Sequence, residues 1–129
     1  MEKTEHINYW IDSAMFDLDV AETLLIARKN LWCLFISHLI IEKALKAYYV
    51  KNNDETPPKI HNLVNLAIKS KVNLSENQLI LLDRLNVFQI SARYPDYKNK
   101  IKSICSDDFT NNLFKQTKEL FEWLKSQLK

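Results

Sequence analysis

The stretch FQISARYPDYKNKIK, residues 88–102, places an arginine, two tyrosines and three lysines around one proline, in a chain that contains no glycine. Arginine presents a planar fork of donors that suits phosphate, tyrosine rings offer stacking faces, and lysines add point charges. We therefore predict that Arg93, Tyr94, Tyr97, Lys98, Lys100 and Lys102 contact a ligand that carries phosphate. Residue types alone leave open a second interpretation, in which this is a solvated basic loop whose tyrosines pack over the end of a helical bundle.

The remaining residues capable of chemistry favour structural roles. His38 falls on the apolar side of an expected helix, His61 follows the Pro57–Pro58 pair, and neither has a second metal ligand or a catalytic partner at suitable spacing. The two cysteines, Cys33 and Cys105, lack a C-x-x-C spacing, so we expect neither a zinc site nor a disulfide framework. We therefore predict no metal and assign no catalytic residue, although Arg93 and Tyr97 are candidates.

Composition limits the class of protein. A length of 129 residues with 47% hydrophobic content predicts one compact domain spanning residues 1–129. The absence of glycine excludes a glycine-rich phosphate loop, and we expect no cofactor. The net charge of +2 is too small for a whole-molecule field to attract nucleic acid, so binding must depend on a local patch. The N-terminal residues form no long apolar run, so we expect no signal peptide, no membrane contact and a cytoplasmic location.

Helical periodicity dominates the chain. Apolar residues recur every three or four positions, which predicts four long helices. The first runs from about His6 to Arg28, and the second carries Leu31 and ends near Lys51. The third runs from Ser75 to about Ser91, and the last begins at Ser106. A shorter helix carrying Ile60 to Ala67 should follow the linker NNDETPP. No segment alternates like a strand. The predicted fold is all-α, an antiparallel up-down four-helix bundle with one extra short helix.

Two local patterns make sharper predictions. Ser75 and Gln78 have the spacing of a capping box, which fixes the start of a helix. In EKALK, Ala44 and Leu45 should face the core, whereas Glu42, Lys43 and Lys46 should face outward or extend to solvent. Glu42 also precedes Lys46 by one helical turn, in the favourable order for an ion pair.

The chain resembles the HEPN domain, named for higher eukaryotes and prokaryotes nucleotide-binding. The similarity lies in IIEKALKAYY at residues 40–49, in an H-x-L motif at His61–Leu63 after a proline-containing linker, and in Arg93-Tyr94-Pro95 closing the next long helix; it extends from about Tyr9 to Leu124. This resemblance implies an antiparallel helical bundle, a homodimer, and genetic pairing with a minimal nucleotidyltransferase as a toxin–antitoxin system.

Ribonuclease members of that family carry an Arg-x4-6-His motif, and this chain departs from it. Arg93 matches the arginine, but Lys98, Asn99 and Lys100 stand where a histidine would be expected. Cleavage of RNA near neutral pH needs a group that exchanges a proton there, and a solvated lysine does not. We therefore favour a binding module that takes up nucleotide or RNA through Arg93. The alternatives are a metal-independent endoribonuclease toxin with a degenerate motif and a structural interaction bundle.

Overall fold

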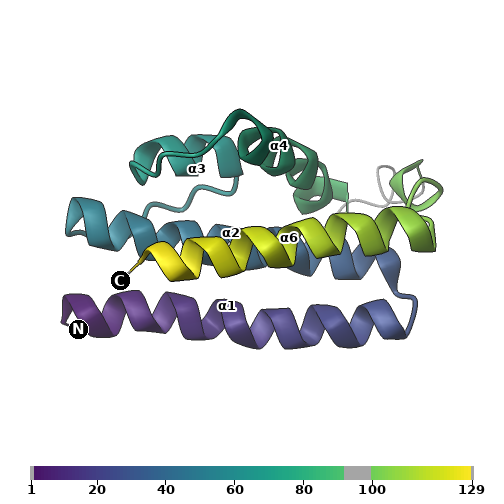
Figure 1. Cartoon of the computed structure of the whole chain (residues 1–129), viewed down its shortest axis with the longest axis horizontal. Coiled ribbons are helices and arrows are strands. Elements are labelled where there is room, and N and C mark those ends of the chain that lie inside the picture. Colours follow the sequence, from purple (N-terminus) through teal and green to yellow (C-terminus); the bar gives the residue numbers. More distant parts are fainter. Residues whose placement is uncertain (1, 92–99, 129) are drawn as a thin grey trace.

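The computed structural model describes residues 2–91 and 100–128, and the regular elements there are all helices. They are α1 (Lys3–Ile26), α2 (Asn30–Asn53), α3 (Leu63–Lys69), α4 (Glu76–Ser91) and α6 (Asp107–Gln127). The long helices run alternately in opposite directions, with α1, α2 and α6 aligned along the long axis of the molecule and α3 and α4 covering one side (Figure 1). The predicted all-α antiparallel bundle is therefore confirmed.

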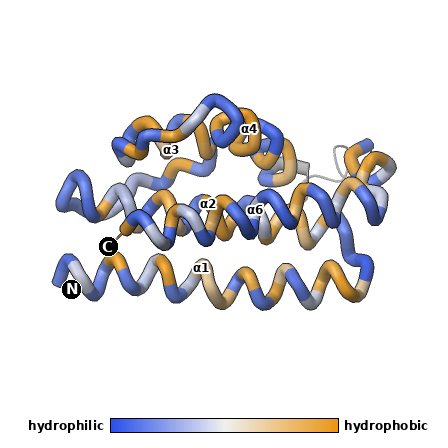
Figure 2. The backbone as a smooth tube through the Cα atoms, in the orientation of Figure 1, coloured by the Kyte–Doolittle hydropathy of each residue, from blue (hydrophilic) through white to orange (hydrophobic). Residues whose placement is uncertain are grey.

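Helix α2 forms the centre of the bundle, because α1, α3, α4 and α6 all pack against it. Its buried residues are not confined to one stripe, and Ile40, Ala44 and Ala47 are inaccessible to solvent. A helix that is apolar on most sides is expected at such a central position. In Figure 2, by contrast, hydrophilic and hydrophobic residues alternate along α1, as expected for a helix with one exposed side.

The helix ends follow the capping residues. The Ser75 amide donates to Gln78 Oε1 (2.8 Å) and the Gln78 amide donates to Ser75 Oγ (3.2 Å), which confirms the predicted capping box at the start of α4. Ser106 caps α6 by accepting a hydrogen bond from the Phe109 amide. α3 begins at Leu63 rather than near Ile60, since Asn62 caps it by accepting from the Asn65 amide.

Within the described residues, three take the left-handed backbone conformation, namely Arg28 (φ 59°), Asp54 (φ 56°) and Lys71 (φ 59°). Each follows the end of a helix, where glycine is the usual residue. A chain without glycine must accept the steric cost of a Cβ atom at these positions. Among the described helices, none has the length and apolar character required to cross a membrane.

Candidate nucleic-acid interface

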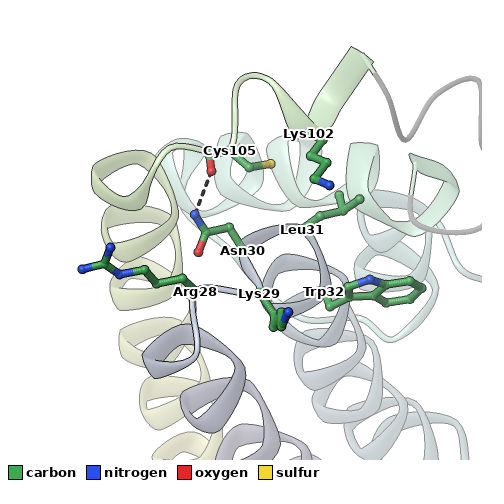
Figure 3. A pocket seen from close by; sticks show the side chains of 7 residues that line it. All are labelled: Arg28, Lys29, Asn30, Leu31, Trp32, Lys102 and Cys105. Atoms are coloured by element: carbon green, nitrogen blue, oxygen red, sulfur yellow. Dashed lines mark hydrogen bonds between the residues drawn. The ribbon is translucent and has the colours of Figure 1, made fainter.

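A cavity of about 350 Å³ opens at the end of the bundle where α1 turns into α2. Residues from this turn and from the segment before α6 line it, namely Arg28, Lys29, Asn30, Leu31, Trp32, Lys102 and Cys105 (Figure 3). Three of these side chains are cationic and none is acidic. The cavity therefore has the charge expected of a site for an anion.

The turn between α1 and α2 positions the basic side chains. The Arg28 amide donates to the Leu25 carbonyl (3.1 Å) and the Lys29 amide donates to the Leu24 carbonyl (2.8 Å). This pair of bonds, with Arg28 in the left-handed conformation, is a Schellman motif. The motif ends α1 abruptly and leaves both side chains exposed at the cavity.

The first turn of α2 adds a further positive contribution. Its N-cap residue, Lys29, makes no capping hydrogen bond through its side chain, and no acidic residue lies in the first turn. The first amides of a helix point outward without a partner inside the helix, and the helix dipole makes this end positive. Since Asn30, Leu31 and Trp32 line the cavity, this end of the helix borders it directly.

Asn30 connects the turn between α1 and α2 to the segment before α6 by hydrogen bonds. Its Nδ2 donates to the Cys105 carbonyl (2.8 Å), drawn as a dashed line in Figure 3, and to Asp107 Oδ1 (3.0 Å). Arg28 lies 3.8 Å from the other Asp107 carboxylate oxygen, and both of these side chains are largely exposed. In Figure 3 the Arg28 side chain points away from Lys102, which reaches toward Leu31 and Trp32.

Two lining residues differ in what they can do chemically. Burial raises the pKa of the Cys105 thiol, so the thiol keeps its proton and is a poor nucleophile near neutral pH. Trp32 is 41% exposed, and an edge-to-face contact with Phe35 (5.9 Å between centroids, 87° between planes) orients its indole ring. The cavity therefore offers charge and an aromatic surface, but no activated thiol.

The structure locates part of the predicted binding set. Lys100 and Lys102 are exposed, and Lys102 lines the cavity. Arg93, Tyr94, Tyr97 and Lys98 lie outside the described residues. Sequence reasoning missed Arg28, Lys29, Asn30 and Trp32. The sequence pattern that could have identified them is the basic pair Arg28 and Lys29, followed by Trp32, at the turn between two helices and without an acidic neighbour.

A second polar cluster lies inside the bundle and corrects the predicted orientation of α2. Glu42 and Lys46 are buried, with exposed fractions of 5% and 8%, so the prediction that they face outward is wrong. Their ion pair is confirmed at 3.1 Å, and Lys46 Nζ also lies 5.4 Å from the centroid of the Trp10 ring. The core positions of Ala44 and Leu45 are confirmed.

The same cluster accounts for the two histidines near α2. Glu42 Oε1 lies 3.1 Å from His61 Nδ1, and the His38 Nε2 atom lies 2.8 Å from the His61 carbonyl oxygen. His38 is fully buried rather than partly buried, and these contacts attach the linker before α3 to α2. Neither histidine lines the cavity. Within the described ranges, no group of three or more metal-ligating side chains gathers.

Asp17 shows the same limit of sequence reasoning on α1. It does not belong to the apolar repeat of that helix, yet it is buried and its Oδ2 atom lies 2.6 Å from Lys43 Nζ. A carboxylate can approach the core at this point because α2 supplies the opposite charge. The ion pair therefore joins α1 to α2.

The HEPN domain family matches residues 7–127 of the chain. The chain belongs to the HEPN family. This membership supports a function related to nucleotides or RNA. The protein TT1696 from Thermus thermophilus has a similar crystal structure, with a TM-score of 0.79 at 16% sequence identity over 94% of this chain and 97% of that one. At this identity the likeness shows the fold alone. A comparison with curated proteins finds no match.

Proposed function

We propose that this HEPN protein binds nucleotide or RNA through Arg93 and the basic residues around it, and that it does not cleave RNA. One observation carries the proposal. Arg28, Lys29 and Lys102 line one cavity at the end of the bundle, and Lys102 belongs to the same short basic stretch as Arg93. Proteins commonly bind phosphates with an arginine guanidinium and further lysine or arginine side chains close to it.

The positions of the histidines favour binding over catalysis. No histidine follows Arg93 in the sequence. In the described part of the chain, His38 and His61 are held in the cluster around Glu42 and do not line the cavity. Lys100 and Lys102 are exposed, so neither lies in the buried setting typical of a lysine that takes the place of histidine in proton transfer.

Two further parts of the proposal concern assembly. Two copies form an isologous homodimer in which both Arg93 side chains line a shared cationic groove, and the dimer acts beside a minimal nucleotidyltransferase as one half of a toxin–antitoxin pair in the cytoplasm. The family supports this interpretation, since HEPN domains commonly dimerise. Apolar surface must hold the two copies together, because like charges on the two basic segments repel each other.

The binding proposal is tested by titrating the purified protein into a fluorescently labelled single-stranded RNA. Arg93→Ala should weaken binding by about tenfold or more, in line with the loss of a charge-assisted bidentate contact. The matched control, Lys59→Ala, removes an exposed charge from the linker and should leave the affinity unchanged. Equal affinities for Arg93→Ala and the unmodified protein would contradict the proposal.

The catalytic alternative and the assembly need their own measurements. Incubation with RNA in the presence of a chelator should leave the RNA intact; metal-independent cleavage that disappears in Arg93→Ala would establish the endoribonuclease instead. Sedimentation at micromolar concentration should show a dimer for the unmodified protein and for Arg93→Ala. The reading frame next to the gene should encode a small nucleotidyltransferase that co-purifies with the protein.

A further inference from the structure

The outer side of α1 carries large apolar side chains that no other described helix covers. Tyr9, Phe16 and Ile26 are 55%, 70% and 84% exposed. Among the described helices, α1 packs against α2 and α6 only, and Figure 1 shows it at one edge of the bundle, away from α3 and α4. The outer side of a surface helix normally carries polar residues. An exposed apolar set of this size on one helix indicates a surface that another molecule covers.

The exposed residues of α1 follow the heptad spacing of a coiled-coil seam. Positions 9, 16 and 23 are seven residues apart, as are positions 12, 19 and 26, and the two sets alternate at intervals of three and four. This outer seam consists of six exposed residues, namely Tyr9, Asp12, Phe16, Asp19, Thr23 and Ile26. Residues at such spacing lie along one side of a helix, where a second helix can pack against them. The shape that fits the outer seam is therefore another helix.

The charge of α1 selects the kind of helix. Residues 4–27 include five acidic side chains and no lysine or arginine. Two of these acids already pair with lysines of α2 and α6. Asp12 and Asp19, both in the outer seam, form no ion pair with any described residue. Because a carboxylate covered by a partner needs an opposite charge to offset its lost hydration, the partner helix must be basic at the positions that face them.

A second copy of this chain does not supply such a helix. Two α1 helices packed together would bring acidic seams into contact, which is unfavourable. The exposed residues of α4 and α6 also include more acidic than basic side chains. The partner is therefore a different protein.

We propose that the outer seam of α1 docks a basic amphipathic helix of another protein. Aliphatic side chains of that helix cover Tyr9, Phe16 and Ile26, and its lysine or arginine side chains lie beside Asp12 and Asp19. This interaction goes beyond the proposed function and does not depend on it, because neither Arg93 nor any residue that lines the cavity belongs to the outer seam.

The first experiment uses a labelled synthetic helix that alternates leucine and lysine along one heptad seam, with binding followed by fluorescence anisotropy. A second peptide with glutamate in place of lysine should bind the unmodified protein about tenfold more weakly or worse. Asp12→Lys/Asp19→Lys should reverse this preference. The matched control, Glu55→Lys/Glu119→Lys, changes the net charge equally at exposed positions outside α1 and should retain it.

The second experiment examines the apolar part of the outer seam. Phe16→Ser should weaken binding of the lysine peptide by about tenfold or more, because a central aromatic contact is lost. Ile80→Ser, at an exposed position of α4, is the matched control and should leave the affinity unchanged. Circular dichroism melts verify that each variant folds. Sedimentation should give the same oligomeric state for Phe16→Ser and the unmodified protein.

Three results would overturn the docking proposal. The first is equal binding, or no binding, of the two peptides by the unmodified protein. The second is a preference for the lysine peptide that survives Asp12→Lys/Asp19→Lys. The third is dissociation of a dimer by Phe16→Ser, which would make the outer seam an interface between two copies. None of these results affects the dependence of RNA binding on Arg93, so the docking proposal and the proposed function can fail separately.

Discussion

At the scale of single residues, Glu42 shows what local spacing can and cannot predict. The ion pair with Lys46 follows from a separation of one helical turn, and it forms. The burial of both residues depends on elements distant in sequence, since Trp10 of α1 lies over Lys46 and His61 of the linker contacts Glu42. No pattern within α2 carries that information. Local spacing therefore predicts the pair but not its environment.

The burial of Glu42 leads to a prediction about stability. Glu42→Ala should lower the free energy of unfolding by about 3–5 kcal/mol, because it leaves the Lys46 ammonium buried without its partner. Glu122→Ala is the matched control, because Glu122 pairs with Lys125 on the exposed side of α6 at 3.3 Å and should contribute less than about 1 kcal/mol. Urea unfolding curves measure both. Similar losses for the two variants would mean that the Glu42 cluster is solvated.

At the scale of elements, some helix boundaries are set by neighbouring residues in the sequence and others by contacts with distant helices. The capping box of Ser75 and Gln78 is complete within four residues, so the start of α4 could be predicted. The start of α3 combines a local cap with a distant contact, because Asn62 accepts from the Asn65 amide and the Leu63 amide donates to Asn86 Oδ1 (2.8 Å), a side chain of α4. The all-round burial of α2 likewise depends on the four helices that surround it. Boundaries set within one segment are thus more predictable than those set by packing.

The end of α3 allows a prediction of increased stability. The Lys71 amide donates to the Ile68 carbonyl and the Val72 amide to the Ala67 carbonyl, a Schellman motif with Lys71 in the left-handed conformation. Lys71→Gly should raise the free energy of unfolding by about 1 kcal/mol, because it removes the steric cost of the Cβ atom. Lys69→Gly, at the last helical residue of α3, should instead lower it, by up to about 1 kcal/mol. Thermal melts that show destabilisation by both changes would contradict the assigned conformation.

At the scale of the whole molecule, charge is distributed unevenly. The net charge is +2, yet Arg28, Lys29 and Lys102 line a single cavity. The sequence indicated the basic stretch that includes Lys102, but the turn that holds Arg28 and Lys29 is distant along the chain. Only the antiparallel arrangement of the helices brings the two segments together (Figure 1). That residues 1–129 form a single domain stays a prediction.

This local concentration of charge makes the salt dependence of RNA binding a direct test of the interface. Each phosphate contact to a single strand contributes about 0.7 to the slope of log affinity against log salt concentration, because it releases condensed counterions. The double variant Lys29→Gln/Lys102→Gln should therefore reduce the slope by about 1.4. The control, Lys59→Gln/Lys69→Gln, changes the net charge by the same amount at exposed positions elsewhere and should leave the slope unchanged. If both variants reduced the slope equally, the net charge of the protein would govern RNA binding and the cavity would have no special part in it.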